Sequence, residues 1–123
     1  MEVKKDFNLE ERLIEFSVMI LDLVEKLPDN YSTRHLGSQL IRSGTSPSLN
    51  YGEAQAAESP KDFSHKMKIC LKELRESQIC LKILEKKEYL KKSDFEEILT
   101  ESGELVAIFT KSVKTIDDKQ RKI

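Results

Sequence analysis

Helical periodicity of apolar residues runs through nearly the whole chain and constrains its fold more than any other feature. Between residues 8 and 27, leucine, isoleucine and valine recur every three or four positions, as one face of an amphipathic α-helix requires. The alternation of β-branched and polar residues that marks strands is absent, and only four glycines and three prolines interrupt 123 residues. The pattern predicts an all-α protein.

Local end signals divide this periodic pattern into four helices. Pro28 ends the first, Ser59 and Pro60 suit the N-cap and first position of the third, and Ser93 opens an S-x-x-E capping box. The expected helices span about residues 8–27, 32–58, 60–88 and 94–118. Long helices with short connections favour an antiparallel, up-down-up-down four-helix bundle, as a single domain over residues 1–123.

The second predicted helix contains an unusually small and polar stretch around Pro47. A proline inside a helix lacks the N–H donor and clashes with the carbonyl four residues earlier, so we expect a kinked or interrupted helix there. Polar residues of this stretch and of the next helix are expected to form a structural polar network. Its members are Arg42, Ser43, Asn50, Glu53, Glu73 and Glu76.

Basic residues are concentrated in the third helix, although the net charge of the chain is −1. Residues 61–92 contain 10 lysines and arginines against 5 acidic residues, whereas residues 1–30 contain 4 against 8. Six basic residues fall within roughly 80° of one helix face and extend over roughly 37 Å. They form a basic ribbon of Lys61, Lys68, Lys72, Arg75, Lys82 and Lys86.

This ribbon has two interpretations. Lysines spaced along a helix are suited to the phosphate backbone of RNA or DNA, with binding that weakens as salt rises. Alternatively, the lysines form a solvated face that pairs with nearby glutamates, and the bundle is a protein–protein interaction scaffold without nucleic-acid binding.

The first and third helices also carry apolar residues that lie away from the predicted core face. Such a stripe is expected to be buried against other copies of the chain in a homo-oligomer; the alternative is a broad core face or scattered surface residues. The candidate subunit-interface residues are Ile14, Val18, Leu21, Ile69, Ile79, Cys80 and Ile83.

No catalytic, metal or cofactor constellation emerges from the sequence, so we expect a non-enzymatic protein without a cofactor. Asp62 and His65 have a spacing compatible with metal ligation, but the second such motif of di-metal bundles is missing. Cys70 and Cys80 are separated by roughly 15 Å along one helix, too far for a disulfide. No apolar run is long enough to span a membrane and no signal peptide is recognisable, which indicates a cytoplasmic protein.

Three segments carry a family resemblance: QLIRSGTS at residues 39–46, NYGEAQAAES at 50–59 and DFSHKMKICLKELRES at 62–77. In these segments the chain resembles the small bacterial four-helix bundle proteins of intervening sequences in 23S rRNA genes. The resemblance implies a ring-like homopentamer without established enzymatic activity. Similar proteins include the accessory protein of diversity-generating retroelements, which binds nucleic acid and the reverse transcriptase. The matching family residues are Arg42, Ser43, Asn50, Glu53, Lys72, Glu73 and Glu76.

Overall fold

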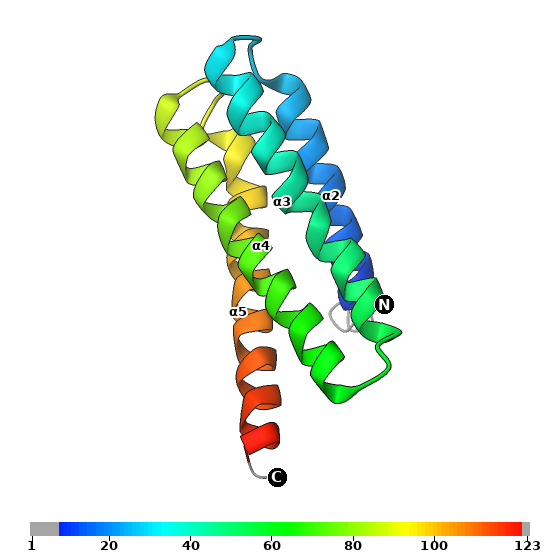
Figure 1. Ribbon diagram of the computed structural model, residues 1–123. Helices are drawn as coiled ribbons and strands as arrows, with labels where there is room; N and C mark the ends of the chain where they lie inside the picture. The colour runs from blue at the N-terminus through cyan, green and yellow to red at the C-terminus, as the bar shows by residue number, and fades with distance from the viewer. Residues whose placement is uncertain (1–7, 122–123) are drawn as a thin grey trace.

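Four helices account for nearly all of the described chain (Figure 1). The computed structural model describes residues 8–121; the outer ends of the expected domain, residues 1–7 and 122–123, lie outside the described residues. The helices are α2 (Leu9–Lys26), α3 (Tyr31–Gln55), α4 (Pro60–Lys87) and α5 (Ser93–Arg121). Neighbouring helices run antiparallel, which confirms the predicted all-α, up-down-up-down bundle.

The helices are arranged so that α3 and α4 form the central packed pair. α3 packs against α2 on one side and against α4 on the other, and α4 in turn packs against α5. Contacts between α2 and α5 are sparse, and within residues 8–121 α2 makes none with α4. α2 and α4 therefore lie diagonally across the bundle.

Side-chain caps fix where the helices start. The Asn8 side chain accepts a hydrogen bond from the backbone N–H of Glu11, and Asn30 forms a capping box with Thr33. Ser59 caps α4 with Pro60 at its first position. Three of the four helix starts are thus determined by residues next to them in the sequence.

The helix through Pro47 is continuous, so the expected interruption of the second helix does not occur. The proline is almost completely buried and leaves one backbone hydrogen bond unmade. Nearby hydroxyls bond to carbonyls of the same helix: Thr45 Oγ1 donates to Ile41 O (2.7 Å) and Ser48 Oγ to Thr45 O (2.9 Å). The helix therefore continues through Pro47 at the cost of one backbone hydrogen bond.

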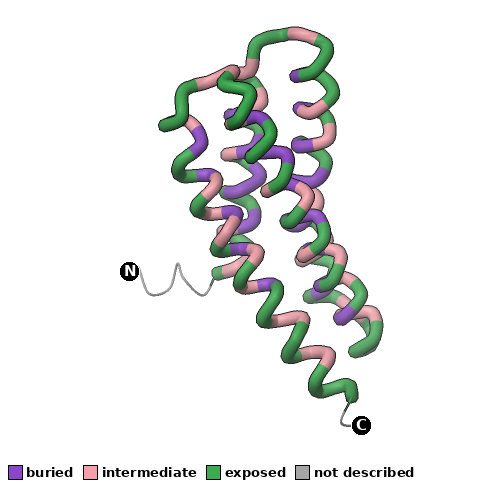
Figure 2. The backbone as a smooth tube through the Cα atoms, turned by 90° about the vertical axis from the view of Figure 1, so that its left-hand side faces the viewer, coloured by how far each residue is buried: buried purple, intermediate pink, exposed green. Residues whose placement is uncertain are grey.

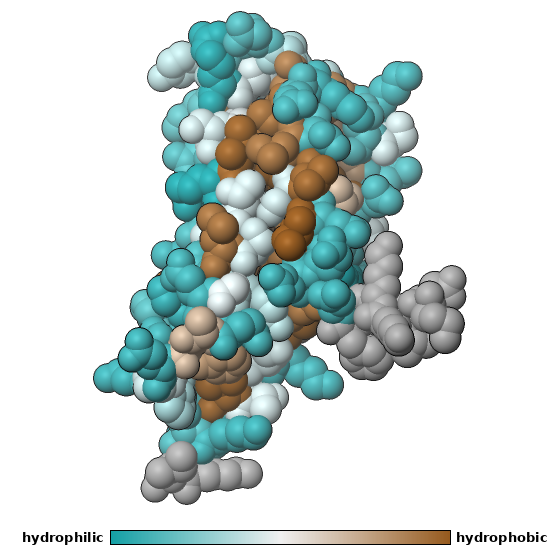
Figure 3. Space-filling model, turned by 90° about the vertical axis from the view of Figure 1, so that its right-hand side faces the viewer, coloured by the Kyte–Doolittle hydropathy of each residue, from teal (hydrophilic) through white to brown (hydrophobic). Residues whose placement is uncertain are grey.

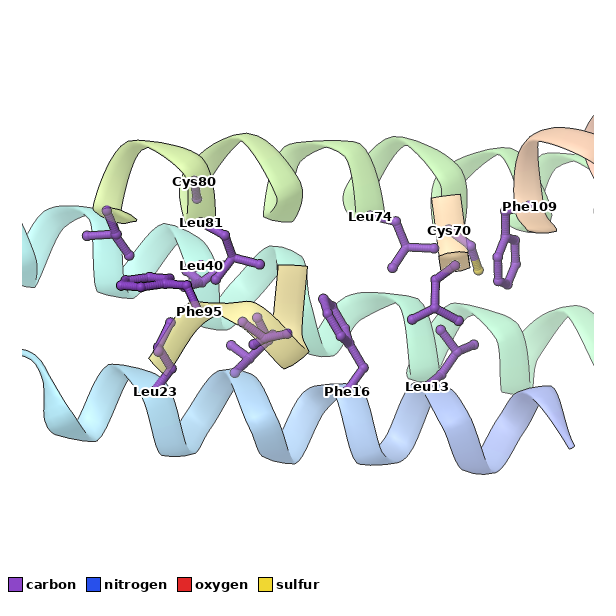
Figure 4. Packing of buried hydrophobic residues seen from close by; sticks show 14 of the residues in the cluster. Leu13, Phe16, Leu23, Leu40, Cys70, Leu74, Cys80, Leu81, Phe95 and Phe109 are labelled. Carbon is purple, nitrogen blue, oxygen red and sulfur yellow. The ribbon is translucent and has the colours of Figure 1, made fainter. Parts of the chain in front are cut away.

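The apolar core extends along the bundle axis and draws on all four helices. In Figure 4, Leu13 and Phe16 of α2 point into the space between the helices, where side chains such as Leu74 of α4 also lie. The ring of Tyr51 meets Phe109 edge-on, with 6.0 Å between centroids. Figure 2 shows buried positions along the body of the bundle, whereas the last turns of α5 are mostly exposed.

Two glycines allow α3 to approach α2 closely. A Cβ added to Gly44 would lie 2.6 Å from Cγ1 of the buried Ile20, and one added to Gly37 would lie 3.2 Å from Val24 Cγ1. The Ser17 hydroxyl of α2 lies within hydrogen-bond distance of the Gly44 carbonyl (3.3 Å). Small residues in this stretch therefore serve helix packing.

Candidate nucleic-acid interface and subunit surfaces

The basic ribbon predicted on the third helix is exposed along the outer face of α4. All six of its side chains are solvent-exposed: Lys61, Lys68, Lys72, Arg75, Lys82 and Lys86. Because they share one continuous helix, their spacing is fixed by the rigid backbone of α4 rather than by a loop.

Two side chains of the ribbon contact residues of α5. Lys68 Nζ lies 3.1 Å from a carboxylate oxygen of Asp117, and Arg75 Nη2 donates weakly to Thr110 Oγ1 at 3.4 Å. Exposed pairs of this kind contribute little and are readily exchanged for another anion. The four remaining lysines of the ribbon have no ion pair to any residue between 8 and 121.

Arg42 links α3 to α4 through two glutamates. Arg42 Nη1 donates to Glu73 Oε1 at 2.8 Å, and Nη2 contacts Glu76 and donates to Gln39 Oε1 at 3.1 Å. Glu73 is only 7% exposed, while half of the Arg42 side chain is in solvent. Partial desolvation lowers the pKa of Arg42, but hydrogen bonds and attraction to Glu73 and Glu76 raise it overall, so the guanidinium stays charged.

A buried hydroxyl pair extends this contact toward the core. Ser43 Oγ of α3 and Ser77 Oγ of α4 are hydrogen-bonded at 3.0 Å, and both residues are fully buried. Ser77 Oγ also lies 3.0 Å from the Glu73 carbonyl oxygen, to which it donates. The adjacent residues Arg42 and Ser43 thus both bond to α4, and the following Gly44 packs against α2.

The expected single polar network is wrong in its extent, because Asn50 and Glu53 lie outside it. Asn50 Nδ2 donates to the carbonyl and hydroxyl oxygens of Ser46 on its own helix (3.0 and 2.8 Å). Glu53 pairs with Lys66 at 2.7 Å on the surface. Both residues lie two or more turns beyond Arg42 on α3, so each has its own partner.

A second interhelical ion cluster, which the sequence did not reveal, joins α2 to α5. Arg12 Nε and Nη2 donate to the two carboxylate oxygens of Glu101 at 3.0 and 2.7 Å, and Nη2 also donates to Glu104 at 2.8 Å. The hydrogen bond with Glu101 is the main reason that the pKa of Arg12 is raised. The partners are 89 and 92 positions apart, so no local spacing marks them.

The expected apolar stripes lie largely on the surface. Exposed fractions are 42% for Ile14, 49% for Val18, 38% for Leu21, 59% for Ile79 and 42% for Ile83. Ile41 and Leu49 of α3 are also exposed, and Figure 3 shows patches of apolar surface separated by residues of intermediate hydropathy on the side of the molecule formed by α2 and α3. The sequence pattern did not predict exposed apolar residues on α3.

One candidate interface residue is wrong, and a second is only partly exposed. Cys80 is 7% exposed and belongs to the core of the chain. Ile69 is half-buried.

Cys70 is also buried, and burial raises the pKa of its thiol to about 12. Residues 8–121 contain no group of three or more His, Cys, Asp or Glu side chains placed to hold a metal ion.

No helix within the described part of the chain is both long and apolar enough to cross a lipid bilayer.

The comparisons with known proteins give a family but no activity. A crystal structure of a protein of unknown function from the S23 ribosomal protein family of Bacteroides thetaiotaomicron is similar, with a TM-score of 0.78 and 32% identity. The match covers 85% of this chain and 97% of that one. No curated protein matches the sequence. Residues 5–111 match the family of 23S rRNA-intervening sequence proteins, and the chain therefore belongs to that family.

Proposed function

We propose that this protein is a non-catalytic, self-assembling four-helix bundle of the cytoplasm that binds the phosphate backbone of RNA or DNA through the basic ribbon of α4. The observation that carries the proposal is the exposure of all six ribbon side chains on one rigid face. Five of them, all except Lys68, lack an ion pair among residues 8–121, so binding a phosphate there displaces mainly water and counterions. Assembly repeats the ribbon around the oligomer; the family resemblance implies five copies.

The proposal is tested by measuring the affinity for single-stranded RNA by fluorescence anisotropy at rising salt concentration. The test variant is Lys61→Glu with Lys72→Glu, both in the first half of the ribbon. The control is Lys91→Glu with Lys92→Glu, which makes the same charge change at exposed lysines between α4 and α5. We expect strong loss of binding in the test variant and a much smaller loss in the control. Equal losses of RNA affinity in the test and control variants would show that binding depends on the overall charge and not on the ribbon.

A second candidate function is a protein-interaction scaffold, which the exposed isoleucines of α4 favour. Ile79 and Ile83 are exposed beside ribbon lysines. Contacts with phosphates do not involve large apolar side chains, whereas exposed apolar residues are typical of protein–protein interfaces. Absence of RNA and DNA binding at low salt, together with a stable oligomer, would support the scaffold and exclude the first proposal.

A further inference from the structure

An open groove lies between α2 and α5, the two neighbouring helices with the sparsest contacts. Its volume is about 890 Å³. Its lining combines exposed apolar surface with carboxylates, and Val18, at 49% exposure, is its most exposed apolar residue. Its lining includes Arg12, Val18, Met19, Glu96, Glu97 and Glu101.

The charge of this groove is negative. Its single arginine, Arg12, is held by Glu101 and Glu104 and so contributes no free positive charge. Glu96 and Glu97 are exposed and have no ion pair within residues 8–121. A partner for the groove must therefore present apolar side chains together with basic ones.

The second half of the outer face of α4 has this chemistry. Ile79 and Ile83 are 59% and 42% exposed, and the exposed Lys82 and Lys86 lie within one turn of Ile83. In the first half of the ribbon no isoleucine or leucine is exposed in this way. The outer face of α4 thus has two chemically different halves.

We propose that the α2–α5 groove of one copy receives the second half of the α4 outer face of another copy. The isoleucines then pack against Val18 and Met19, and Lys82 and Lys86 lie near Glu96 and Glu97. α4 lies diagonally across the bundle from α2, so groove and ligand are different surfaces of the molecule. Such a head-to-tail contact repeats and closes into a ring when the rotation between copies allows it.

This inference rests on the self-assembly proposed above and assigns separate tasks to the two halves of α4. Lys82 and Lys86 are committed to the contact between copies. Lys61 and Lys72, in the first half, remain free for nucleic acid. Substitutions in the two halves should therefore affect different measurements.

A charge swap tests the contact, with self-association measured by sedimentation equilibrium and folding checked by circular dichroism. Reversal of the basic side (Lys82→Glu with Lys86→Glu) or of the acidic side (Glu96→Lys with Glu97→Lys) is expected to weaken association about tenfold or more. The variant with all four substitutions restores opposite charges and should recover much of the association. Failure of the four-fold variant to recover, with each pair disruptive alone, would overturn the pairing.

Apolar substitutions provide an independent test at exposed positions where folding is not at stake. Ile79→Ser should weaken association, whereas the control Leu49→Ser, at a residue 67% exposed on α3, should not. A wild-type protein that is monomeric throughout would refute the proposed self-assembly as well as this contact. An oligomer that is unchanged by Ile79→Ser and by both charge reversals would refute only the contact and leave self-assembly standing.

Discussion

Replacement of Gly44 by alanine tests the close approach of α2 and α3 that the small central segment of α3 makes possible. Two effects of this substitution oppose each other. Alanine is favoured over glycine inside a helix by about 1 kcal/mol. Against this, the new Cβ would lie 2.6 Å from Ile20 Cγ1 and 3.0 Å from both Cδ1 and Cγ2, and Ile20 is fully buried. Overpacking of this kind costs about 1–3 kcal/mol.

Gly52 provides a matched control on the same helix. It is exposed, and a Cβ there would meet no atom within 4 Å. Gly52→Ala should therefore show the helix-propensity gain alone, about 1 kcal/mol. The difference between the two variants removes the propensity effect and leaves the overpacking cost at Gly44. We expect Gly44→Ala to be less stable than Gly52→Ala by about 1–3 kcal/mol.

Urea unfolding followed by circular dichroism measures both variants, at one fixed protein concentration because association adds to apparent stability. The same two substitutions are then made in the Ile20→Ala variant, which lacks the three carbon atoms nearest to the added Cβ. In that variant, Gly44→Ala should no longer be destabilising relative to Gly52→Ala. If Gly44→Ala is as stabilising as Gly52→Ala in the wild-type background, the tight α2–α3 contact is wrong.

The remaining predictions concern α4 and its partners. Arg42→Ala should lower the melting temperature more than Arg34→Ala, whose ion pair is fully on the surface, because only the first leaves the buried Glu73 without its guanidinium; equal melting temperatures would contradict this. Glu88→Gly should raise the melting temperature, since Glu88 has a left-handed backbone (φ 59°) that costs a non-glycine residue about 1–2 kcal/mol. Because the pKa of Cys70 rises to about 12 in the folded state, the unfolded thiol ionises first, and stability should fall from about pH 8.5 upward. Cys70→Ala should show a shallower decline in urea unfolding between pH 8 and 10, and an unchanged decline would exclude the thiol as its cause.

The features of the fold that the sequence predicted well are local. Ser59 and Pro60 start α4 because capping depends only on the first turn of the helix. The S-x-x-E signal locates the start of α5 to within one residue, but Ser93 is the first helical residue and not the N-cap, and the Lys91 N–H donates to Asp94 Oδ2 instead. The all-α class follows from periodicity, which is a property of each helix by itself. The outcome at Pro47 differs because the helix continues through the proline with its ring buried in the bundle, and periodicity along one helix does not show this packing.

The features that the sequence could not predict depend on the rotation and register of one helix against another. Arg12 contacts Glu101 only because α2 and α5 lie side by side in one particular register along the bundle axis. The helical wheel places Cys80 on the surface side of α4, but its side chain is buried in the core, because the neighbouring helices decide whether a residue at the edge of the buried sector is covered. The ribbon was predictable because all of its residues lie on the same helix. The extent of the Arg42 contacts was not predictable, because they join two helices.

The salt dependence of single-stranded RNA binding tests whether the basic ribbon of α4 binds a phosphate backbone. The plot of log affinity against log salt concentration should fall with a slope of about −0.7 for each phosphate contacted. Neutralising Lys61→Gln and Lys72→Gln together should therefore make the slope shallower by about 1.4, while Lys91→Gln with Lys92→Gln should leave it nearly unchanged. A wild-type protein with no affinity for RNA at low salt, or the same slope in both double variants, would contradict the claim.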